Sequence, residues 1–507
     1  MSTLHTAPHL AGPQPLDPTA EAQRRLLDAQ RAAFLAEGPP ALDVRLDRIN
    51  RLLACVLEHA DDLCAALDAD FGSRSPLTSL ASDIVSAIPD VQLIRENLAG
   101  WMADEEIPGS AEAGRPAFVQ TRPKGVVGVV GPWNFPVILV VQPAIEALAA
   151  GNRVMIKFSE VAERTAEVFA RAVASRMSVE EVVVVRGGVD TATAFSSLPF
   201  DHLIFTGSPG VGARVAAAAG ENLVPLTLEL GGKNPVVLGS DADVALAAAR
   251  VAGMRLMNGG QICLCPDYVF VPRERVEEFL AVYEESVRAH FPTYLDNPDV
   301  VSIVNDRNFD RVTGLVADAE SKGARVLTIA PPEEADALPR RASRRIAPTV
   351  LLDVTEDMAV ASEEIFGPVL AVYPYDDLDD VITYVNTRPS PLAAYFFGSD
   401  GPEFREFIRR TTSGGVSRND LAVHWGLAGA PSGGIGHSGM GAYHGKVGFL
   451  AFSHRRTIAA STALKGTAQN FLPPAGQAET DALRGFVAHT LVDIRQRIGD
   501  GTSPRQP

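Results

Sequence analysis

Short apolar runs alternate with longer amphipathic stretches between residues 126 and 229. The runs rich in β-branched residues are 126–130, 153–157, 182–186, 201–205 and 225–229. Strands that alternate with helices are typical of a parallel, doubly wound sheet. The connection 163–176 is rich in Ala, has a polar outer face and is long enough for a crossover helix. The pattern therefore predicts an α/β fold built on a Rossmann-type parallel sheet.

The remaining pattern predicts further elements on both sides of this region. We expect two long helices over 21–69, a helix over 241–258, and strands at 268–271 and 370–373 that belong to a second α/β domain. Two extended runs flank Pro123-Lys124-Gly125 within 115–130, which predicts a hairpin and a subunit contact. The Gly-rich stretches 411–419 and 429–442 are expected to form rigid loops near a site. An amphipathic helix is expected near 481–498.

One uncharged stretch, 125–145, is long enough to suggest a membrane span. Its Gly and Pro residues instead divide it into a buried strand, a loop and the start of a helix. We therefore expect no membrane anchor.

Composition narrows the class of protein. The chain has 507 residues, is 46% hydrophobic and carries a net charge of −17, which excludes nucleic acid or an anionic membrane as the main partner. Its four cysteines form neither a disulfide framework nor a zinc site, so no metal is expected and a reducing cytoplasm is predicted. The first 20 residues lack the pattern of a secretory signal, so no export is expected.

Polar residues fall where the predicted strands end. Asn134 follows the first strand, Lys157 ends the second, Gly207 follows the fourth and Glu229 ends the fifth. In open α/β sheets, ligands bind at the carboxyl edge of the strands. The positions alone therefore predict a site there.

Cys263 and two of these strand-end residues, Asn134 and Glu229, offer groups for nucleophilic catalysis. Cys263 lies in a Gly-rich stretch that allows close approach, although its thiol needs nearby donors to become a thiolate, and most free cysteines are inert. Asn134 carries an N–H donor suited to an oxyanion, or it forms a turn. Glu229 would serve as a base if burial raised its pKa, or it caps the following helix. Cys265 is expected to be a bystander.

Other motifs are suited to binding a dinucleotide. Gly207-Ser208-Pro209-Gly210-Val211-Gly212 follows a strand and opens a helix, which suits a pyrophosphate, but alone it more often marks a plain turn. Lys157 and Glu160 would otherwise be read as a solvated ion pair.

Four motifs in order resemble the aldehyde dehydrogenase superfamily from about residue 20 to 457. They are Pro132-Trp133-Asn134-Phe135-Pro136, Glu229-Leu230-Gly231-Gly232-Lys233, Asn258-Gly259-Gly260-Gln261-Ile262-Cys263 and Glu363-Glu364-Ile365-Phe366-Gly367-Pro368. The resemblance implies Cys263 as nucleophile, Asn134 as oxyanion donor and Glu229 as the base that activates water. It also implies an NAD cofactor, with NADP possible, bound by Trp133, Lys157, Glu160, Gly207, Ser208, Gly212, Glu364 and Phe366. A carboxylate at Glu160 favours NAD, because it accepts a bond from a free 2′-OH and repels a 2′-phosphate.

The resemblance also implies a domain plan. A flexible tail (1–20) precedes an NAD-binding domain (21–229), whose 106–125 hairpin joins a small β oligomerisation element. An α/β catalytic domain (230–417), a return to the cofactor and oligomerisation region (418–460) and a C-terminal extension (461–507) follow.

Within the superfamily, Ser438-Gly439-Met440-Gly441-Ala442-Tyr443-His444-Gly445 resembles the class 3 branch, whose members are commonly dimers. The stretches 30–34 and 70–75 resemble its bacterial coniferyl aldehyde dehydrogenases, which implies an aromatic or medium-chain aldehyde and a homodimer. Ser432 stands where the family usually has Phe, which bears on the choice of substrate. A CoA-acylating enzyme and a catalytically silent NAD-binding or structural relative remain as alternatives.

Overall fold

The computed structural model describes residues 18–462, 466–470, 472–474 and 476–498. The chain divides into a larger unit, residues 1–103 and 121–454, and a smaller one, residues 104–120 and 455–507. Most of the predicted N-terminal tail and part of the predicted C-terminal extension lie outside the described residues. The predicted domain boundaries within the larger unit stay predictions.

The first sheet of the larger unit has the strand order β15-β7-β6-β3-β4-β5. Its strands are β3 (Val126–Val130), β4 (Arg153–Lys157), β5 (Val182–Val185), β6 (His202–Gly207), β7 (Leu226–Leu230) and β15 (Gly439–Met440). All but β15 run parallel. The predicted parallel sheet is confirmed. Its strands β3, β4 and β5 are fully buried, as is typical of parallel sheets, and β3 and β5 are rich in Val.

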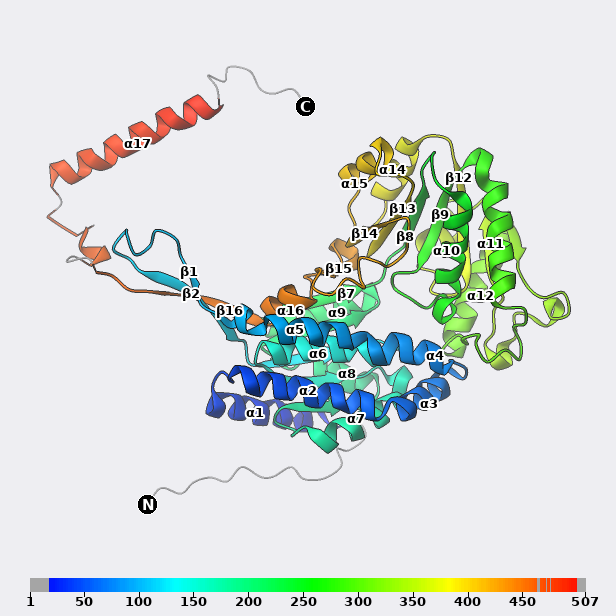
Figure 1. The fold of residues 1–507 in the computed structure, drawn as a ribbon, viewed down its shortest axis with the longest axis horizontal. Helices are drawn as coiled ribbons and strands as arrows, with labels where there is room; N and C mark the ends of the chain where they lie inside the picture. The colour runs from blue at the N-terminus through cyan, green and yellow to red at the C-terminus, as the bar shows by residue number, and fades with distance from the viewer. Residues whose placement is uncertain (1–17, 463–465, 471, 475, 499–507) are drawn as a thin grey trace. The chain divides into compact units, whose positions relative to one another are not determined.

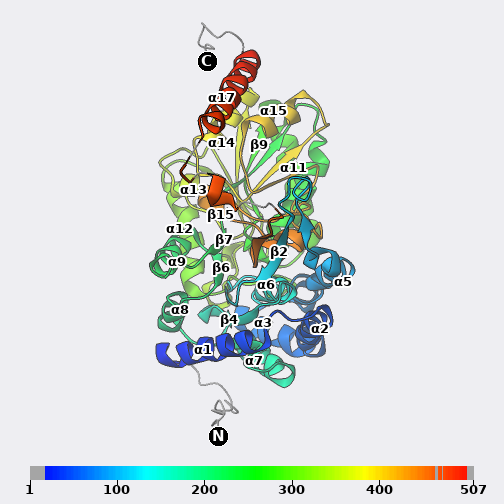
Figure 2. The same cartoon turned by 90° about the vertical axis from the view of Figure 1, so that its left-hand side faces the viewer.

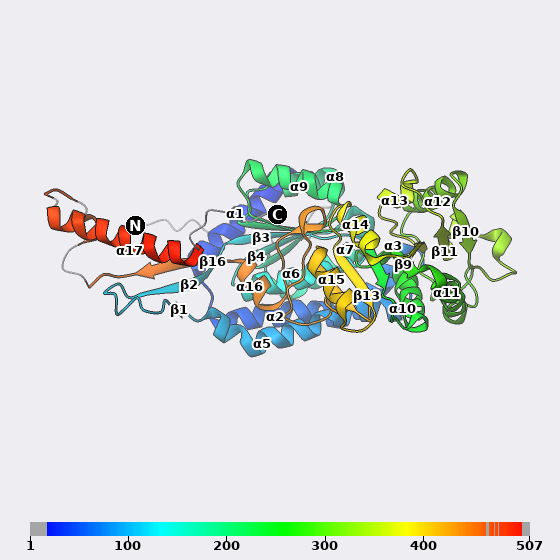
Figure 3. The ribbon, with the colours of Figure 1, turned by 90° about the horizontal axis from the view of Figure 1, so that it is seen from above.

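Helices cover both faces of this sheet (Figure 2). One face carries α1 (Ala20–Glu37), α8 (Val189–Ser196) and α9 (Pro209–Glu221); the other carries α6 (Ile138–Ala149) and α7 (Glu163–Arg176). Further out lie α2 (Leu42–Glu58), α3 (Ala60–Phe71), α5 (Ile88–Met102) and α16 (Gly445–Ala451) (Figure 3). The predicted crossover helix 163–176 coincides with α7 and is confirmed.

The prediction of two helices over 21–69 is wrong, because this stretch forms three. Gly38 ends α1 with a φ of 71°, and the chain turns again at His59, between α2 and α3. Cys55 and Cys64, both buried, lie on α2 and α3.

A helical run over Pro76–Met102 meets the length and hydropathy criteria for a membrane span. It consists of α4 (Pro76–Ser79), a π-helical turn (Leu80–Ile84), a 3-10 turn (Val85–Ala87) and α5. Its apolar side chains Ile84, Val91, Ile94 and Leu98 are buried in the core of the larger unit. A helix buried in a protein core passes the same length and hydropathy criteria.

The second sheet has the order β10-β11-β12-β9-β8-β13-β14. Its strands are β8 (Asn234–Leu238), β9 (Pro266–Pro272), β10 (Arg325–Thr328), β11 (Thr349–Leu352), β12 (Val369–Tyr375), β13 (Ala393–Phe397) and β14 (Gly415–Arg418). Its helices are α10 (Val244–Leu256), α11 (Val276–His290), α12 (Asp306–Ser321), α13 (Ala359–Ser362), α14 (Leu378–Asn386) and α15 (Pro402–Arg410) (Figure 1). The expected second α/β layer is confirmed.

Short 3-10 turns complete the described chain. They are Glu160–Ala162, Met257–Gly260, Arg273–Arg275, Ala335–Ala337, Arg341–Ser343, Gly436–Ser438 and Thr467–Asn470.

A three-stranded sheet of order β1-β2-β16 belongs mainly to the smaller unit. It consists of β1 (Glu105–Glu106), β2 (Ala117–Pro123) and β16 (Ser453–Ala459). The hairpin predicted over 115–130 is wrong: β2 pairs antiparallel with β1, while β3 pairs with β4 and β6 in another sheet. The predicted C-terminal helix is confirmed as α17 (Gln477–Ile498).

Candidate active site

The strand ends gather the predicted residues at one edge of the first sheet. The strand registers place Val130 beside both Lys157 and Phe205, and Thr206 beside Glu229. Because β3, β4, β6 and β7 run parallel, their carboxyl ends meet at the same edge. The loop 429–442 reaches this edge too, since Gly439 pairs with Glu229 across β7 and β15.

Cys263 lies in a tightly turned loop between the two sheets. The preceding turn has left-handed backbone at Asn258 and Gly259, and at Gly260, where φ is 74°. A Cβ on Gly260 would lie 2.3 Å from the carbonyl oxygen of Gly367, so only glycine fits. Asn234 then anchors the loop by donating from Nδ2 to the carbonyl oxygen of Cys263 at 2.7 Å.

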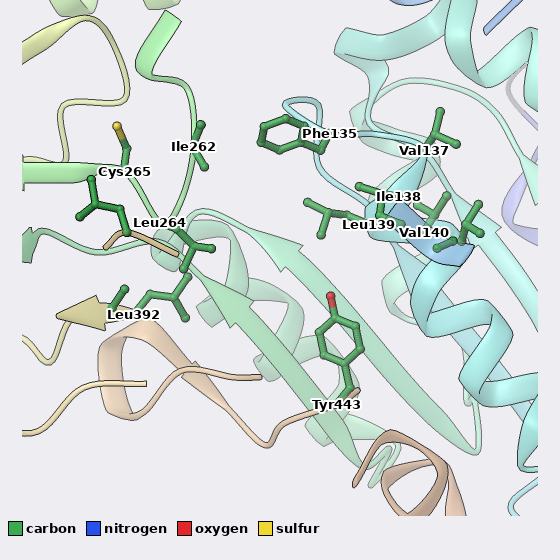
Figure 4. Close-up of a cluster of buried hydrophobic side chains, with 14 of the residues drawn as sticks. Phe135, Val137, Ile138, Leu139, Val140, Ile262, Leu264, Cys265, Leu392 and Tyr443 are labelled. Atoms are coloured by element: carbon green, nitrogen blue, oxygen red, sulfur yellow. The ribbon is translucent and has the colours of Figure 1, made fainter. Parts of the chain in front are cut away.

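Of the four cysteines, Cys263 alone is partly exposed. Cys55, Cys64 and Cys265 are buried, and all four are free. The neighbours of Cys263 on either side, Ile262 and Leu264, point into an apolar cluster with Tyr443 (Figure 4). The cysteine that we expect to react is therefore the least buried of the four.

Asn134 is bonded directly to the loop that carries Cys263. Its Nδ2 donates to the carbonyl oxygen of Gln261 at 3.1 Å, and its own carbonyl oxygen accepts from Nδ2 of Asn258 at 3.2 Å. The side chain is buried. Asn134 is thus hydrogen-bonded to the residue two positions before Cys263.

A buried ion pair supports Asn134, and no pattern in the sequence predicts it. Arg74 donates to the carbonyl oxygen of Asn134 at 3.1 Å and to Asp83 at 2.7 Å. Both charged side chains have an exposed fraction of 0%. Asp83 also accepts from the backbone N–H groups of Val137 and Ile138, at the start of α6. Burial pulls the pKa of Asp83 up and the pKa of Arg74 down, against their mutual attraction.

Glu229 is buried without a hydrogen-bond partner for either carboxylate oxygen among the described residues. Burial raises its pKa well above the ordinary value of a glutamate. Burial therefore disfavours the ionised carboxylate, and no ion pair among the described residues fixes Glu229 as an anion. No helix cap among the described residues uses it, so the capping interpretation finds no support.

The pKa of Cys263 moves opposite to the sequence expectation that nearby donors would lower it. Burial raises the pKa of the thiol to about 12, and the charges of Glu364 and Glu229 raise it further. Both carboxyl groups therefore lie near enough for their charges to act on the sulfur. Glu364 is itself shifted, since burial and then Asp267 raise its pKa to about 8.

Two basic residues hold the loop that contains Glu364 in place. Lys233 pairs with Asp267 and donates to the carbonyl oxygen of Glu363 at 3.0 Å. Arg311 donates to the carbonyl oxygens of Glu364 and Ile365, at 3.0 and 2.7 Å. A Cβ on Gly231 would lie 2.2 Å from Oε2 of Glu364, so the glycine at the end of β7 lets this carboxylate approach.

Two predicted cofactor residues are in contact at the same edge. The rings of Trp133 and Phe366 meet edge to face, with centroids 5.3 Å apart. Phe366 has left-handed backbone with a φ of 50°, which turns its ring toward Trp133. The structure thus joins the loop after β3 to the loop after α13.

The predicted phosphate loop has a structural reason for at least one of its glycines. Ser208 is the N-cap residue of α9, which begins at Pro209, and Gly207 ends β6. A Cβ on Gly212 would lie 2.6 Å from a methyl group of Leu230, so this glycine allows α9 to pack against β7. The role of the loop in phosphate binding stays a prediction.

Of the two predicted adenosine residues, Glu160 borders a cavity of about 180 Å³ at the ends of β4 and β5, and Lys157 does not. Buried Lys157 donates from Nζ to the carbonyl oxygens of Phe158 and Gly187, at 2.6 and 2.7 Å. Glu160 is exposed and lines the cavity. Arg186 lines it too, and the sequence analysis assigned Arg186 no role.

Ser432, the position that departs from the family pattern, is buried and bridges Tyr443 through two backbone hydrogen bonds. Tyr443 is fully buried, and its hydroxyl has no partner among the described residues. Its ring points toward Leu139 and Leu264 (Figure 4). The motif that contains Tyr443 did not predict its position in the core near Cys263.

Comparisons with known proteins agree with this arrangement. The model of the aldehyde dehydrogenase family matches residues 17–458. A probable coniferyl aldehyde dehydrogenase of Caulobacter vibrioides is 47% identical over 437 residues, 85% of this chain and 90% of that protein. The solved structure of the substrate-bound AldH of Staphylococcus aureus has a TM-score of 0.84 at 30% identity and covers 91% of this chain and 99% of that one. A Mycobacterium tuberculosis aldehyde dehydrogenase complexed with NAD+ has a TM-score of 0.78 at 29% identity, with coverages of 89% and 92%.

Proposed function

The chain belongs to the aldehyde dehydrogenase family and is therefore an oxidoreductase that converts aldehydes to carboxylic acids with NAD(P), and we propose that it acts on coniferyl aldehyde or a related aromatic aldehyde. The observation that carries the chemistry is the partly exposed thiol of Cys263 beside an unpaired, buried Glu229. A medium-chain aliphatic aldehyde is the second candidate substrate. The apolar side chains Ile262, Leu264 and Tyr443 suit either kind of chain (Figure 4).

The residues at the sheet edge fit a dinucleotide. At one end, the cavity beside Glu160 has space for part of the dinucleotide. At the other end, the carboxylate of Glu364, which packs closely against Gly231, provides a hydrogen-bond acceptor. We assign Lys157 and Glu160 to the adenosine ribose and Glu364 to the nicotinamide ribose. Trp133 and Phe366 border the ring, while Gly207, Ser208 and Gly212 form the turn at the pyrophosphate. A bound NAD supplies the acceptor for the hydride that leaves the aldehyde carbon.

The first step belongs to Cys263. Its sulfur adds to the aldehyde carbon and forms a thiohemiacetal, and the developing oxyanion accepts hydrogen bonds from Asn134 and from the backbone N–H of Cys263. Asn134 uses one described bond, to Gln261, so its amide retains an N–H for this role. The thiol gives up its proton to solvent water, so an ionised Glu229 stays free to act in the second step.

The second step belongs to Glu229. Loss of hydride leaves a thioester on Cys263, which water must hydrolyse to release the acid. A carboxylate with a raised pKa is a stronger base than an ordinary one and takes a proton from the attacking water. Because neither oxygen of Glu229 is engaged by a described residue, both are available to that water.

The alternative of a CoA-acylating enzyme would share Cys263 but would have no use for a hydrolytic base. The unpaired Glu229 therefore favours hydrolysis over transfer to CoA. A silent relative would need none of Cys263, Asn134 and Glu229, and all three lie at one site. We rank these alternatives second and third.

We also propose that the protein is a cytoplasmic homodimer that binds neither nucleic acid nor a membrane. The four free cysteines support a cytoplasmic location. The net charge of −17 argues against binding to nucleic acid or to an anionic membrane. The smaller unit supports the dimer, because α17 exposes a row of apolar side chains: Leu483, Phe486, Val487, Leu491, Ile494 and Ile498.

A product assay tests the proposal directly. The purified protein is incubated with coniferyl aldehyde and NAD, with and without CoA, and the products are separated by chromatography. We expect the free acid in both cases, and NADH equal in amount to it. A strict requirement for CoA would overturn the hydrolytic assignment. Far better use of hexanal or octanal than of coniferyl and cinnamyl aldehydes would overturn the aromatic substrate and leave the family reaction in place.

A further inference from the structure

A second cavity, of about 520 Å³, lies at the opposite edge of the first sheet, where the parallel strands begin. Pro123 and Lys124, which line it, lie at the end of β2 and just before β3. Asp201 precedes β6, and Leu223 and Pro225 precede β7. The cofactor and reaction sites lie at the carboxyl ends of the same strands, so this cavity is separate from both.

The walls of the cavity are partly apolar. Three prolines, Phe200 and Leu223 contribute to them. Leu223 is 89% exposed, so its side chain is available to a ligand. Sites for small molecules are mainly apolar and have volumes of about 300 to 1,000 Å³. The cavity therefore suits the apolar body of a small organic molecule.

Lys124 brings an amine to this cavity, and two acceptors hold it. Its Nζ donates to the carbonyl oxygen of Ala451 at 2.5 Å and to Nδ1 of His202 at 2.8 Å. The other ring nitrogen of His202 lies 2.9 Å from Oγ1 of Thr227 and donates its proton there. The imidazole is thus a neutral acceptor for the amine.

The surroundings of Lys124 favour the neutral amine over the ammonium. No carboxylate pairs with it among the described residues, and Asp201, in the same cavity, pairs with Arg31 at 3.2 Å. Burial lowers the pKa of Lys124, and burial followed by the charge of Lys124 lowers the pKa of His202 to about 3. A neutral amine has two N–H groups, one for each acceptor, and a lone pair that no described residue engages.

We propose that Lys124 is a second site of reaction with aldehydes, at which its amine condenses with an aromatic or medium-chain aldehyde to form an imine. The lone pair of Nζ adds to the carbonyl carbon, and the carbonyl electron pair moves to the oxygen. The oxygen then leaves as water with the two amine protons, a C=N bond remains, and nothing is oxidised or reduced. The inference goes beyond the proposed function, because it needs neither the cofactor nor Cys263.

The chain contains its own reference amines, since it has six lysines. Lys157 is buried and donates to two carbonyl oxygens. Lys233 and Lys322 pair with carboxylates. Lys446 is exposed, so solvent stabilises its ammonium. Among the described lysines, Lys124 combines a lowered pKa with a place in a cavity.

Reductive trapping on the full-length protein without NAD tests the proposal. The protein is incubated at pH 7 with benzaldehyde or hexanal and sodium cyanoborohydride, and peptide mass spectrometry measures the alkylated fraction of each lysine over time. We expect Lys124 to be alkylated at least about tenfold faster than Lys446, because each unit by which a pKa falls raises the neutral fraction about tenfold. Lys124→Arg should remove this label and leave the labelling of Lys446 unchanged.

Leu223→Asp tests the cavity itself, because a carboxylate there stabilises the ammonium of Lys124 and should slow its alkylation about threefold or more. Leu77→Asp is the matched control, since Leu77 is 77% exposed and lies outside the cavity, and it should leave the rate unchanged. Alkylation of Lys124 no faster than that of Lys446 would overturn the inference, as would equal rates in the two Asp variants. If a variant does not fold, the comparison of lysines in wild type decides. Because NAD is absent, none of these outcomes bears on the oxidation assigned to Cys263.

Discussion

The two ends of the sheet edge differ in whether their buried charged groups have hydrogen-bond partners. At the adenosine end, the buried ammonium of Lys157 donates to carbonyl oxygens, and Glu160 lies in solvent. At the reaction end, Glu229 is buried with no described partner, and burial raises the pKa of Cys263 to about 12. Glu364 shares this environment.

The difference indicates what each end is for. A binding site gains from groups whose charges are fixed and satisfied, since a ligand then meets a preformed surface. A reaction site needs groups that change protonation state, and burial without a partner provides this by bringing the pKa of a carboxylate toward neutral pH. We therefore expect changes at the reaction end to leave cofactor binding intact, and changes at the adenosine end to leave the reactivity of Cys263 intact.

The largest expected effect comes from removing the sulfur. Cys263→Ala should lower turnover of every aldehyde by at least about 10⁴-fold, because no other described group at the site replaces the nucleophile. The Kd for NADH should stay within about twofold of wild type, since the adenosine end is untouched. Steady-state assays and a fluorescence titration measure the two quantities. Retained turnover would refute the assignment, and Cys265→Ala, which removes the neighbouring buried thiol, is the control.

Removing the base should separate the two chemical steps. Glu229→Gln keeps the shape and cannot accept a proton, so we expect a burst of about one NADH per active site followed by steady-state turnover that is about 10²- to 10³-fold slower than wild type. The stalled thioester should appear as an added acyl mass on Cys263 in intact-protein mass spectrometry. A variant that still hydrolyses at the wild-type rate would assign the water-activating role elsewhere.

Substitutions in the ion pair of Arg74 and Asp83 test whether the reaction end depends on the residues that hold Asn134 in place. Asp83→Asn leaves the buried charge of Arg74 uncompensated and should lower the free energy of unfolding by about 3 to 5 kcal/mol. The exposed pair of Arg24 and Asp28 is the control, and Asp28→Asn should cost at most about 1 kcal/mol. Urea unfolding measures both. If Asp83→Asn does not fold, Arg74→Met with Asp83→Leu restores an uncharged core, and its loss of turnover then reports on the hydrogen bonds that the pair makes to Asn134 and to the start of α6.

Much of the fold could be predicted from the sequence, because its strands and helices follow local patterns of hydrophobic and polar residues. Fully buried strands such as β3 and β5 are runs of valine, and α7 has a regular polar face. The strand-end positions of Lys157 and Glu229 also predict that both residues lie at the same sheet edge, since parallel strands share a carboxyl edge.

What could not be predicted depends on contacts between distant residues. Arg74 and Asp83 look like ordinary surface charges until folding places them under Asn134. The break at His59 carries no Gly or Pro, so nothing local marked it. The direction of the pKa shift at Cys263 depends on burial and on two carboxylates from other strands and loops. Arg186 follows a strand as many arginines do, and only the cavity distinguishes it.

The smallest effect concerns the ionisation of the thiol before any ligand binds. With a pKa of about 12, the thiolate fraction of Cys263 should keep rising from pH 7 to pH 10, and so should its rate of alkylation by iodoacetamide. Glu364, with a pKa of about 8, is ionised at pH 9 and opposes the thiolate. Glu364→Gln removes that charge, lowers the pKa of Cys263 and should raise the alkylation rate at pH 9 by about three- to tenfold.

Glu160→Gln makes the same chemical change at the adenosine end and should leave the alkylation rate of Cys263 unchanged. Mass spectrometry of the peptide that contains Cys263 measures the rate in each variant, with the buried thiols as internal references. A rate that levels off between about pH 9 and pH 10 in wild type, as for a thiol with the ordinary pKa of about 8.5, would mean that the pKa of Cys263 is not raised. An equal effect of both Gln substitutions would mean that general surface charge, rather than the buried carboxylate beside the sulfur, governs its ionisation, and the contrast between the two ends would fail.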